Sequence, residues 1–265
     1  MEITGSTRLL AIVADPVAHV KTPQRLNALL ERLGTDAVMV ACHVAPDALP
    51  AFLAGARAIR NLDGLVVTVP HKEAAAALCD ELTPAARAIG AVNAVRVADG
   101  RLTGGNFDGI GFVAGLRRQG HEPAGRRVYL AGAGGAGKAI AHALAEAGVA
   151  GLSLHNRSRD KAQAVASQLH ARFPHVPVTV VDDIPGDCDI AINATSLGLK
   201  DDDPLPFAPQ ALAPGALVAD AVMRRDDTPL LAAALACGCR VHPGRHMLEG
   251  QLSEIARFLG IAAPD

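Results

Sequence analysis

Short apolar runs alternate with amphipathic stretches along the first hundred residues of the chain. The apolar runs predict buried strands at 9–14, 37–44 and 64–69. The amphipathic stretches predict helices at roughly 23–33 and 47–58, with another helix after Lys72. Such alternation is typical of βαβ units, and it therefore predicts a mainly parallel sheet.

Residues 90–106 change this pattern, because two short strands flank an Asp99-Gly100 turn and predict a hairpin that closes the first domain. A helix at roughly 108–119 follows, and then a second alternating series begins. Its apolar runs predict strands at 127–132, 151–156, 176–181, 189–194 and 215–220. The last segment, 247–260, predicts a helix with one apolar face that could pack on either domain. The fold class is therefore α/β, with a second, doubly wound layer after the first domain.

Composition narrows the classes of function. The chain has 265 residues, half of them hydrophobic, a net charge of −2, one tyrosine and no tryptophan. Without basic blocks or many rings for base stacking, nucleic-acid binding is not expected. No apolar run approaches the roughly 20 residues of a membrane span, and the amino terminus lacks a signal-peptide pattern. We therefore expect a cytoplasmic protein with a small-molecule substrate, no membrane partner and a possible homodimer.

Cysteine and histidine spacing does not predict a metal site. The five cysteines form neither an even disulfide set nor paired CxxC knuckles, so we expect reduced thiols. His242 and His246 are four residues apart, but Pro243 and Gly244 between them would break the helix that such ligand spacing requires.

The segment LVVTVPHK (65–72) places a lysine where a strand should end. Pro70 cannot donate to a sheet ladder, so His71 and Lys72 are expected at the carboxyl end of that strand. Open α/β sheets bind ligands at this edge, and a lysine partly stripped of water can exchange a proton with a substrate hydroxyl. A solvated lysine at the start of a helix is the alternative.

The segment GAGGAG (132–137) matches the dinucleotide fingerprint at Gly132, Gly134 and Gly137. It follows a predicted strand and opens a predicted helix, whose amino terminus offers free N–H groups to a pyrophosphate. The same residues resemble a Walker A loop as far as Lys138, but Ala139 stands where a hydroxyl would hold magnesium. Dinucleotide binding is therefore favoured over a P-loop phosphotransferase.

The second strand of this unit ends without the acidic residue that usually binds the ribose 2′-hydroxyl of NAD. Asn156, Arg157 and Ser158 stand there, followed by Lys161, and these donors suit a 2′-phosphate. NADP is therefore the expected cofactor, although NAD remains possible because Asp160 is close by.

Eight segments together resemble the shikimate dehydrogenase family, in order and nearly from end to end. They are DPVAHVKTP (15–23), VTVPHK (67–72), GAVNAV (90–95), GGNFDGIGF (104–112), GAGGAG (132–137), NRS (156–158), NATSLGL (193–199) and MLEGQ (247–251). The resemblance implies an α/β substrate-binding domain at 1–104, a Rossmann doubly wound dinucleotide-binding domain at 105–245, and a cleft between them. It also implies that the terminal helix, 246–265, returns to the first domain. The implied activity is hydride transfer between NADP or NAD and a ring hydroxyl of shikimate or quinate, in aromatic amino acid biosynthesis.

The resemblance also implies residue roles. Lys72 matches the catalytic lysine of the family, and Asp108 matches its partner aspartate. Thr22, Thr68, Asn93 and Gln251 match residues that contact the substrate. We expect the cofactor to contact these residues: Gly132, Ala133, Gly134, Gly135, Ala136, Asn156, Arg157, Ser158, Lys161, Thr195, Ala221, Gly244 and Met247.

Four apolar residues depart from the family pattern on the expected substrate side. The first loop usually reads H-S-x-S-P, and here Val20 replaces the first serine, while Thr22 replaces the second and keeps its hydroxyl. Val66, Phe107 and Met223 stand where asparagine, threonine and tyrosine are expected. The loss of one protein hydroxyl that donates to the substrate carboxylate would weaken substrate binding by about 1.5–3 kcal/mol. The residues therefore favour a nicotinamide-dependent dehydrogenase for a cyclic carboxylate or polyol, and leave open a cofactor-binding regulator or scaffold without turnover.

Overall fold

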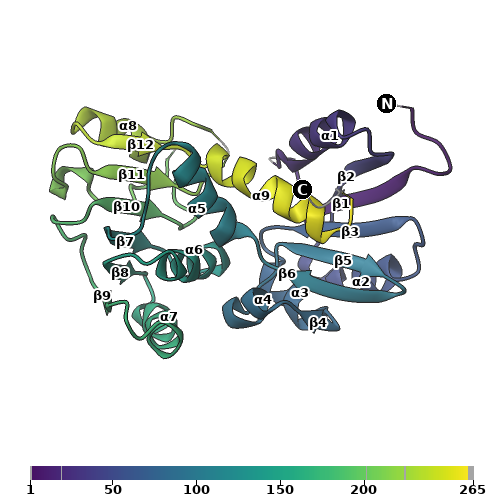
Figure 1. Cartoon of the computed structure of the whole chain (residues 1–265), viewed down its shortest axis with the longest axis horizontal. Coiled ribbons are helices and arrows are strands. Elements are labelled where there is room, and N and C mark those ends of the chain that lie inside the picture. Colours follow the sequence, from purple (N-terminus) through teal and green to yellow (C-terminus); the bar gives the residue numbers. More distant parts are fainter. Residues whose placement is uncertain (1, 19, 201, 224, 262–265) are drawn as a thin grey trace. The chain divides into compact units, whose positions relative to one another are not determined.

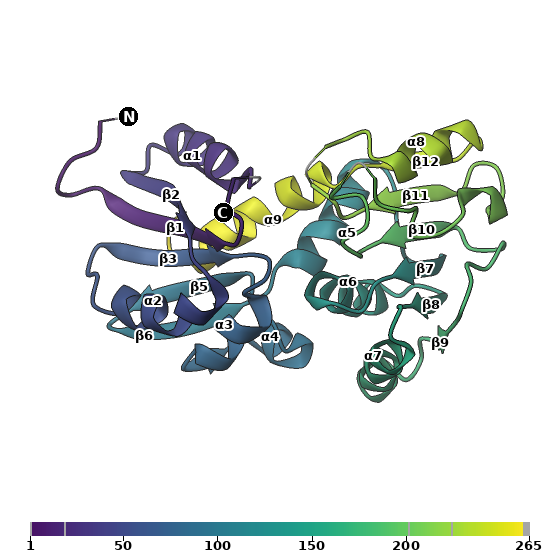
Figure 2. The same ribbon diagram turned by 180° about the vertical axis from the view of Figure 1, so that it is seen from behind.

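The computed structural model describes residues 2–18, 20–200, 202–223 and 225–261. The chain forms two compact units, which Figures 1 and 2 show from opposite sides. One unit contains the chain up to Phe107 and the segment from Leu252 onward, and the other is Asp108–Gln251. Contacts thus divide the chain after Phe107 and after Gln251, whereas the predicted divisions are after residue 104 and before residue 246.

The first unit contains a six-stranded mixed sheet in the order β2-β1-β3-β5-β6-β4. Its strands are β1 (Arg8–Ala14), β2 (Ala37–His43), β3 (Leu62–Val67), β4 (Glu81–Leu82), β5 (Ala94–Ala98) and β6 (Arg101–Gly105). Strands β1, β2 and β3 are parallel, and β5 runs antiparallel to both β3 and β6. The predicted β5–β6 hairpin is confirmed, and its turn residue Asp99 has a φ of +52°, which aspartate tolerates in such turns.

Helices cover both faces of this first sheet. They are α1 (Thr22–Arg32), α2 (Leu49–Ala56), α3 (Lys72–Leu78) and α4 (Pro84–Ile89), with a short 3-10 turn, η1 (Pro46–Ala48). Apolar side chains of α2 and α3, such as Leu53 and Ala75, pack with Leu65 and Val95 of the sheet to form one core. On the opposite face, Leu259 lies so close to Gly64 of β3 that a Cβ there would be 2.5 Å from the Leu259 side chain.

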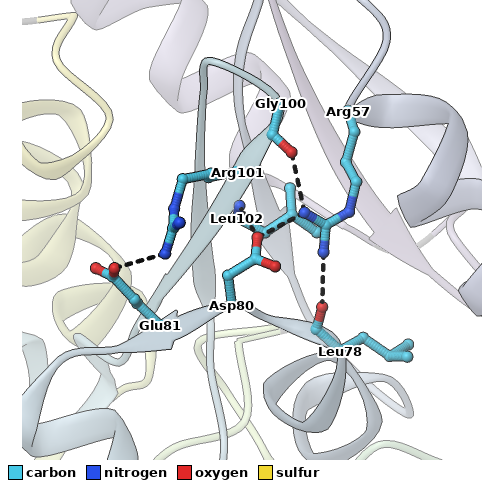
Figure 3. Close-up of polar contacts among 7 residues, drawn as sticks. All are labelled: Arg57, Leu78, Asp80, Glu81, Gly100, Arg101 and Leu102. Carbon is cyan, nitrogen blue, oxygen red and sulfur yellow. Dashed lines mark hydrogen bonds and ion pairs between the residues drawn. The ribbon is translucent and has the colours of Figure 1, made fainter.

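An ion-pair network ties the hairpin to the neighbouring helices (Figure 3). The Arg57 guanidinium donates to Asp80 Oδ2 at 2.5 Å and to the carbonyls of Gly100 and Leu78 at 3.0 and 3.3 Å. Asp80 also accepts the Leu102 N–H at 2.7 Å. The hydrogen bond from Arg57, followed by that from Leu102, lowers the pKa of Asp80, so its carboxylate is favoured in the folded chain.

The second unit contains a fully parallel six-stranded sheet in the order β12-β11-β10-β7-β8-β9. Its strands are β7 (Arg127–Ala131), β8 (Gly151–His155), β9 (Val178–Val180), β10 (Ile190–Asn193), β11 (Leu217–Asp220) and β12 (Arg240–His242). This is the strand order of a doubly wound dinucleotide-binding fold, with the order reversing between β7 and β10. The predicted second layer is confirmed.

Helices on both faces bury this second sheet. They are α5 (Asp108–Arg118), α6 (Gly135–Glu146), α7 (Arg159–Arg172), α8 (Pro229–Ala236) and α9 (Arg245–Phe258), with a 3-10 turn η2 (Pro209–Ala211). Apolar residues of α5, α6 and α7 form one core with the strands. Leu230 and Leu231 of α8 pack with Tyr129 and Phe207 in a second core on the other face. Among the described residues, no helix has the length and apolar character needed to cross a bilayer.

The largest differences from the predicted elements concern short segments. Strands β4 and β12 and helix α4 were not predicted, because two to six residues carry too little periodicity. Strand β3 ends at Val67 and not at residue 69, because Thr68 already belongs to the turn that closes with a bond from His71 N–H to Thr68 O at 2.9 Å.

Candidate functional site

Three parallel strands of the first sheet end at the same edge. The register pairs Ala14 of β1 with His43 of β2, and Val13 with Val67 of β3. Asp15 follows β1 and Thr68 follows β3, and Nε2 of His43, the last residue of β2, lies 2.7 Å from Asp15 Oδ1. This edge is where α/β sheets place ligands, so the residues around it form the first half of the candidate site.

Lys72 is the first residue of α3 and is half-buried at this edge. Two bonds fix the turn that carries it: His71 N–H donates to Thr68 O at 2.9 Å, and His71 Nε2 contacts the Val44 carbonyl at 2.8 Å. The Lys72 carbonyl in turn accepts the Val92 N–H at 3.0 Å. The lysine is therefore held by the backbone at a defined place, as expected for a residue that acts on a ligand.

Asn93 and Thr68 belong to the same group of bonds. Val67 N–H donates to the Asn93 carbonyl at 2.8 Å, and Asn93 N–H donates to Gly105 O at 2.9 Å. The buried Asn93 side chain accepts the Phe107 N–H through Oδ1 at 2.9 Å, which orients its amide. The structure thus brings together Thr68, Lys72 and Asn93, three of the predicted site residues.

Thr22 opens helix α1 and is buried. The residue before it, Lys21, is exposed and forms no side-chain cap, and the first turn of α1 has no acidic residue. The place of Thr22 at a helix amino terminus suits an anionic group of a ligand.

Asp108 and Gln251 lie in the second unit, both of them buried. Asp108 is the first residue of α5, and one turn later a Cβ on Gly111 would be 2.6 Å from the Gln251 Cβ of helix α9. Glycine at position 111 therefore lets the two helices touch at Gln251. Lys72 and Asp108 belong to different units.

The four apolar residues that depart from the family pattern lie in different surroundings. Val66 is buried within β3, and Phe107 packs its ring on Phe258 with centroids 5.1 Å apart. Met223 is partly buried against the core of the second unit, and Val20 is half-buried before α1. Phe107 and Val66 thus contribute to packing in the first unit, which accounts for their apolar character.

The glycine turn between β7 and α6 fits a dinucleotide. Gly132 has a φ of +114°, and a Cβ on Gly137 would lie 2.1 Å from the Gly132 carbonyl oxygen, so neither position has room for a side chain. Gly134 caps α6 without a side-chain cap, and a Cβ there would meet nothing within 4 Å. The turn therefore presents an open helix amino terminus flanked by Ala133, Gly135 and Ala136, as a pyrophosphate requires. Ala139 is buried in α6 and offers no hydroxyl for a nucleotide-bound metal.

Asn156, at the end of β8, is bonded to this turn. Its Oδ1 accepts the Ala133 N–H at 3.1 Å, and its Nδ2 donates to Ser158 O at 2.9 Å. Arg157, Ser158 and Lys161 follow and are exposed. Arg159, by contrast, forms an ion pair with Asp182. Arg157 is therefore the guanidinium at this helix start that has no carboxylate partner among the described residues, and it can meet a phosphate.

Thr195, Ala221 and Gly244 lie in the loops after β10 and β11 and before α9, at the carboxyl edge of the second sheet. Met247 is buried in the core of the unit. Most of the predicted cofactor residues thus lie just after β7, β8, β10 and β11, whereas Gly244 follows β12 and Lys161 and Met247 lie in α7 and α9. Among the described residues, no cluster of three or more His, Cys, Asp or Glu side chains could hold a metal ion.

The sequence interpretation missed two polar residues at this edge, Asn193 and Asp220. They end the buried strands β10 and β11, and both are fully buried. Asn193 Nδ2 donates to Asp220 Oδ1 at 2.9 Å. A signal was present, because an amide and a carboxylate closing apolar strands need partners when they are buried.

Comparisons with known proteins agree over both units. The family model "Shikimate dehydrogenase substrate binding domain" matches residues 12–95, and "Shikimate / quinate 5-dehydrogenase" matches residues 116–199. The shikimate dehydrogenase (NADP(+)) of Rubrobacter xylanophilus is 41% identical over 268 aligned residues, covering 99% of this chain and 94% of the relative.

Two solved structures are also similar over nearly the whole chain. Shikimate 5-dehydrogenase from Thermus thermophilus, in complex with NADP(H) and shikimate, has a TM-score of 0.87 and 34% identity, covering 98% of this chain and 95% of that one. Ligand-free 5-ketofructose reductase of Gluconobacter sp. strain CHM43 has a TM-score of 0.85 and 32% identity, with the same coverage of 98% and 95%.

Proposed function

The chain belongs to the shikimate dehydrogenase family, and we propose that it interconverts a hydroxyl and a keto group on shikimate, quinate or a related hydroxylated ring. It is an NAD(P)-dependent oxidoreductase of this type, and NADP is its cofactor. The alternative of a regulator or scaffold without turnover is not supported, because relatives that match nearly the full chain are named as enzymes.

The observation that carries the proposal in this chain is the bonded group of Thr68, Lys72 and Asn93. Backbone bonds fix the turn that carries the half-buried Lys72 at the ligand-binding edge of a sheet, and the Phe107 N–H orients the side-chain amide of Asn93. A ring with several hydroxyls needs neutral donors and acceptors of this kind around one proton-exchanging group. Thr22 and Gln251 are proposed as further substrate contacts, because the family motifs place them so.

The proposed mechanism separates hydride transfer from proton transfer. When NADP is bound, it supplies the hydride acceptor in one direction and, in reduced form, the hydride donor in the other. In the oxidation, neutral Lys72 takes the hydroxyl proton as the C–H bond gives up its electron pair and the C=O bond forms. In the reduction, the Lys72 ammonium protonates the alkoxide oxygen. Asp108 is proposed as the second proton-handling residue, because it matches the partner aspartate of the family motif.

The residues proposed to hold NADP follow from the second unit. The N–H groups of the Gly134–Gly137 turn face the pyrophosphate, and Asn156 keeps that turn in place. Arg157, Ser158 and Lys161 bind the 2′-phosphate. Thr195, Ala221, Gly244 and Met247 belong to the segments proposed for the nicotinamide side.

A neutral substrate is a second candidate, and one observation favours it. Val20 replaces a hydroxyl in the loop that the family pattern assigns to the substrate carboxylate, and the chain resembles a 5-ketofructose reductase as well as shikimate dehydrogenases. Thr22 and the exposed Lys21 favour a carboxylate substrate instead, because both side chains can donate hydrogen bonds to an anion. The substrate screen must therefore include carboxylate-free keto sugars and polyols.

The test is a screen of the purified protein with NADP and NAD, in both directions, against shikimate, quinate, cyclic polyols and 5-ketofructose. We expect NADP-dependent turnover of at least one of them, lost in Lys72→Met and in Asp108→Asn. Activity confined to the neutral compounds would support a neutral substrate, the second candidate. Turnover that is unchanged in Lys72→Met would overturn the mechanism, and no turnover of any compound would overturn the proposed substrate class.

We further infer that the protein works in the cytoplasm as a homodimer. The five cysteines, all described, form no disulfide, which is usual in a reducing compartment. Cell fractionation and sedimentation velocity test the two statements separately, since a monomeric mass would contradict only the second.

A further inference from the structure

Asp220 is a fully buried carboxylate at the end of β11, and three different segments donate hydrogen bonds to it. Asn193 Nδ2 and the Val222 N–H donate to Oδ1 at 2.9 and 3.0 Å, and the Thr228 hydroxyl donates to Oδ2 at 2.7 Å. Thr228 also accepts the Leu231 N–H at 3.3 Å, so its own proton is available to Asp220. These groups all donate to the carboxyl, as the ionised form requires.

Burying the Asp220 carboxylate costs free energy. Burial raises the pKa of Asp220, while the three hydrogen bonds counteract that rise. Among the residues that the structure describes, no cation pairs with the carboxylate. A buried charge balanced by hydrogen bonds alone adds little to stability, and such groups cluster where a ligand site needs a fixed geometry.

Asn193, the first partner of Asp220, organises the loop after β10. Its Oδ1 accepts both the Thr195 N–H at 3.0 Å and the Thr195 hydroxyl at 2.7 Å, while Nδ2 also donates to Leu197 O at 3.0 Å. The Leu197 N–H closes the loop on Thr195 Oγ1 at 3.1 Å. An amide can make this set of bonds in one orientation only, and the Asp220 carboxylate selects that orientation because it accepts and never donates.

Two further segments, the glycine turn and the start of α9, lie against the loops next to Asn193 and Asp220. A Cβ on Gly244, just before α9, would be 2.3 Å from the Val222 carbonyl oxygen. A Cβ on Gly132 would be 2.6 Å from the Ala194 carbonyl oxygen. The glycine turn therefore packs directly on the loop after β10, and the start of α9 packs directly on the turn after β11. Asp220 fixes both of these loops. Figure 1 shows the neighbouring strands β7, β10 and β11 that bring them together.

From this geometry we infer that Asp220 is a positioning residue for the cofactor, which acts through Asn193 and Val222 on the loops that carry Thr195, Ala221 and Gly244. The inference rests on the proposed function only in taking NADP as the molecule that these loops bind. Thr228, the N-cap of α8, is a second positioning residue, because its hydroxyl supplies the third hydrogen bond to the carboxylate.

The test compares Asp220→Asn, Thr228→Val and Thr228→Ser in full-length protein. Asparagine keeps the shape of the side chain but turns a donor toward Asn193 or Thr228, so NADP should bind at least tenfold more weakly. Thr228→Val should weaken NADP about three- to tenfold, whereas Thr228→Ser, which keeps the hydroxyl, should stay within twofold of the parent. Asp189→Asn is the matched control, because Asp189 lies before β10 at the opposite edge and accepts the Arg127 N–H at 2.8 Å.

A second measurement needs no cofactor. In the ligand-free protein, hydrogen exchange of the Thr195, Leu197 and Val222 amides should become faster in Asp220→Asn and in Thr228→Val, while the amides of β7 keep their protection. At saturating NADP, turnover of these variants should remain within about threefold of the parent.

Three results would overturn the inference. One is unchanged NADP affinity in Asp220→Asn, another is equal losses in Thr228→Ser and Thr228→Val, and the third is faster exchange spread evenly over the second unit. If Asp220→Asn fails to fold, the Thr228 pair decides alone. A parent protein that binds neither NADP nor NAD would instead contradict the proposed function, and the exchange data would still report on the loops.

Discussion

At the carboxyl edge of the first sheet, Lys72 and Asn93 are held mainly by backbone hydrogen bonds, whereas at the carboxyl edge of the second sheet Asn193 and Asp220 bond each other through their side chains. The first arrangement fixes the backbone positions of Lys72 and Asn93. The second uses polar side chains to fix the loops after β10 and β11, because Asn193 and Asp220 accept the Thr195 and Val222 N–H groups. The comparison shows two ways to fix a sheet edge: backbone bonds hold the turn that carries Lys72, and side-chain bonds hold the loops after β10 and β11.

The strongest expected effect is the loss of turnover in Lys72→Met, because this change removes the proton-exchanging group from the first edge. General acid–base catalysis contributes about 10²–10⁴-fold, so the turnover number should fall by that factor. NADP affinity should stay within about twofold, since no cofactor residue is altered. Lys200→Met, at an exposed loop position, serves as the control. An equal loss of turnover and of cofactor affinity would contradict a catalytic role for Lys72.

The next effect concerns backbone shape in the glycine turn. Gly137→Ala places a Cβ 2.1 Å from the Gly132 carbonyl oxygen, so we expect a loss of about 1–3 kcal/mol in the free energy of unfolding together with severely weakened NADP binding. Gly134→Ala meets nothing within 4 Å, and it should keep the stability within about 0.5 kcal/mol while still obstructing the pyrophosphate.

Urea unfolding and cofactor titration of the two glycine variants separate packing from binding. If Gly134→Ala binds NADP like the parent, the open helix amino terminus does not receive the pyrophosphate.

Charge at the second edge should set the choice of cofactor. Arg157→Ala should weaken NADP relative to NAD by roughly 1–3 kcal/mol, the range for charge-assisted bonds to a phosphate. Arg159→Ala is the matched control two residues away, because its guanidinium is already paired with Asp182 and should not change the NADP/NAD ratio. Dissociation constants for both cofactors give the answer, and an unchanged ratio in Arg157→Ala would assign the 2′-phosphate to other residues.

The two edges also differ in how far they could be predicted. The apolar runs identified the parallel strands, and the spacing of Gly132, Gly134 and Gly137 identified the turn, because each of these signals is local. Asn193 and Asp220 are 27 residues apart, and their contact depends on β10 and β11 being neighbours in the sheet. Sequence periodicity gives strands but not their order, so this contact could not be predicted.

The other misses have physical causes of the same kind. Strand β12 has three residues, too few for a period to be visible, although it forms the edge of the second sheet. Helix α9 has one continuous apolar pattern, yet it contributes to both units, with the change after Gln251. Hydrophobicity shows that a face is buried, and it does not show against which partner.

The smallest expected effect follows from His242 and sharpens the contrast between the units. His242 is buried at the end of β12, and neither of its ring nitrogens has a hydrogen-bond partner among the described residues. Burial, with smaller contributions from His246, His121 and Arg245, lowers its pKa from 6.5 to about 3. Between these values the unfolded chain binds a proton that the folded chain does not, so stability falls as the pH drops below about 6.5.

At pH 5.5, one unit below the unfolded pKa, His242 should therefore reduce the free energy of unfolding by about 1.4 kcal/mol relative to pH 8. His242→Phe removes the titration and keeps an aromatic ring against Phe112, whose centroid lies 6.1 Å away. The variant should lose about that much of the parent's pH dependence in urea unfolding. If acid instead weakens the parent and His242→Phe alike, the sensitive group is not His242.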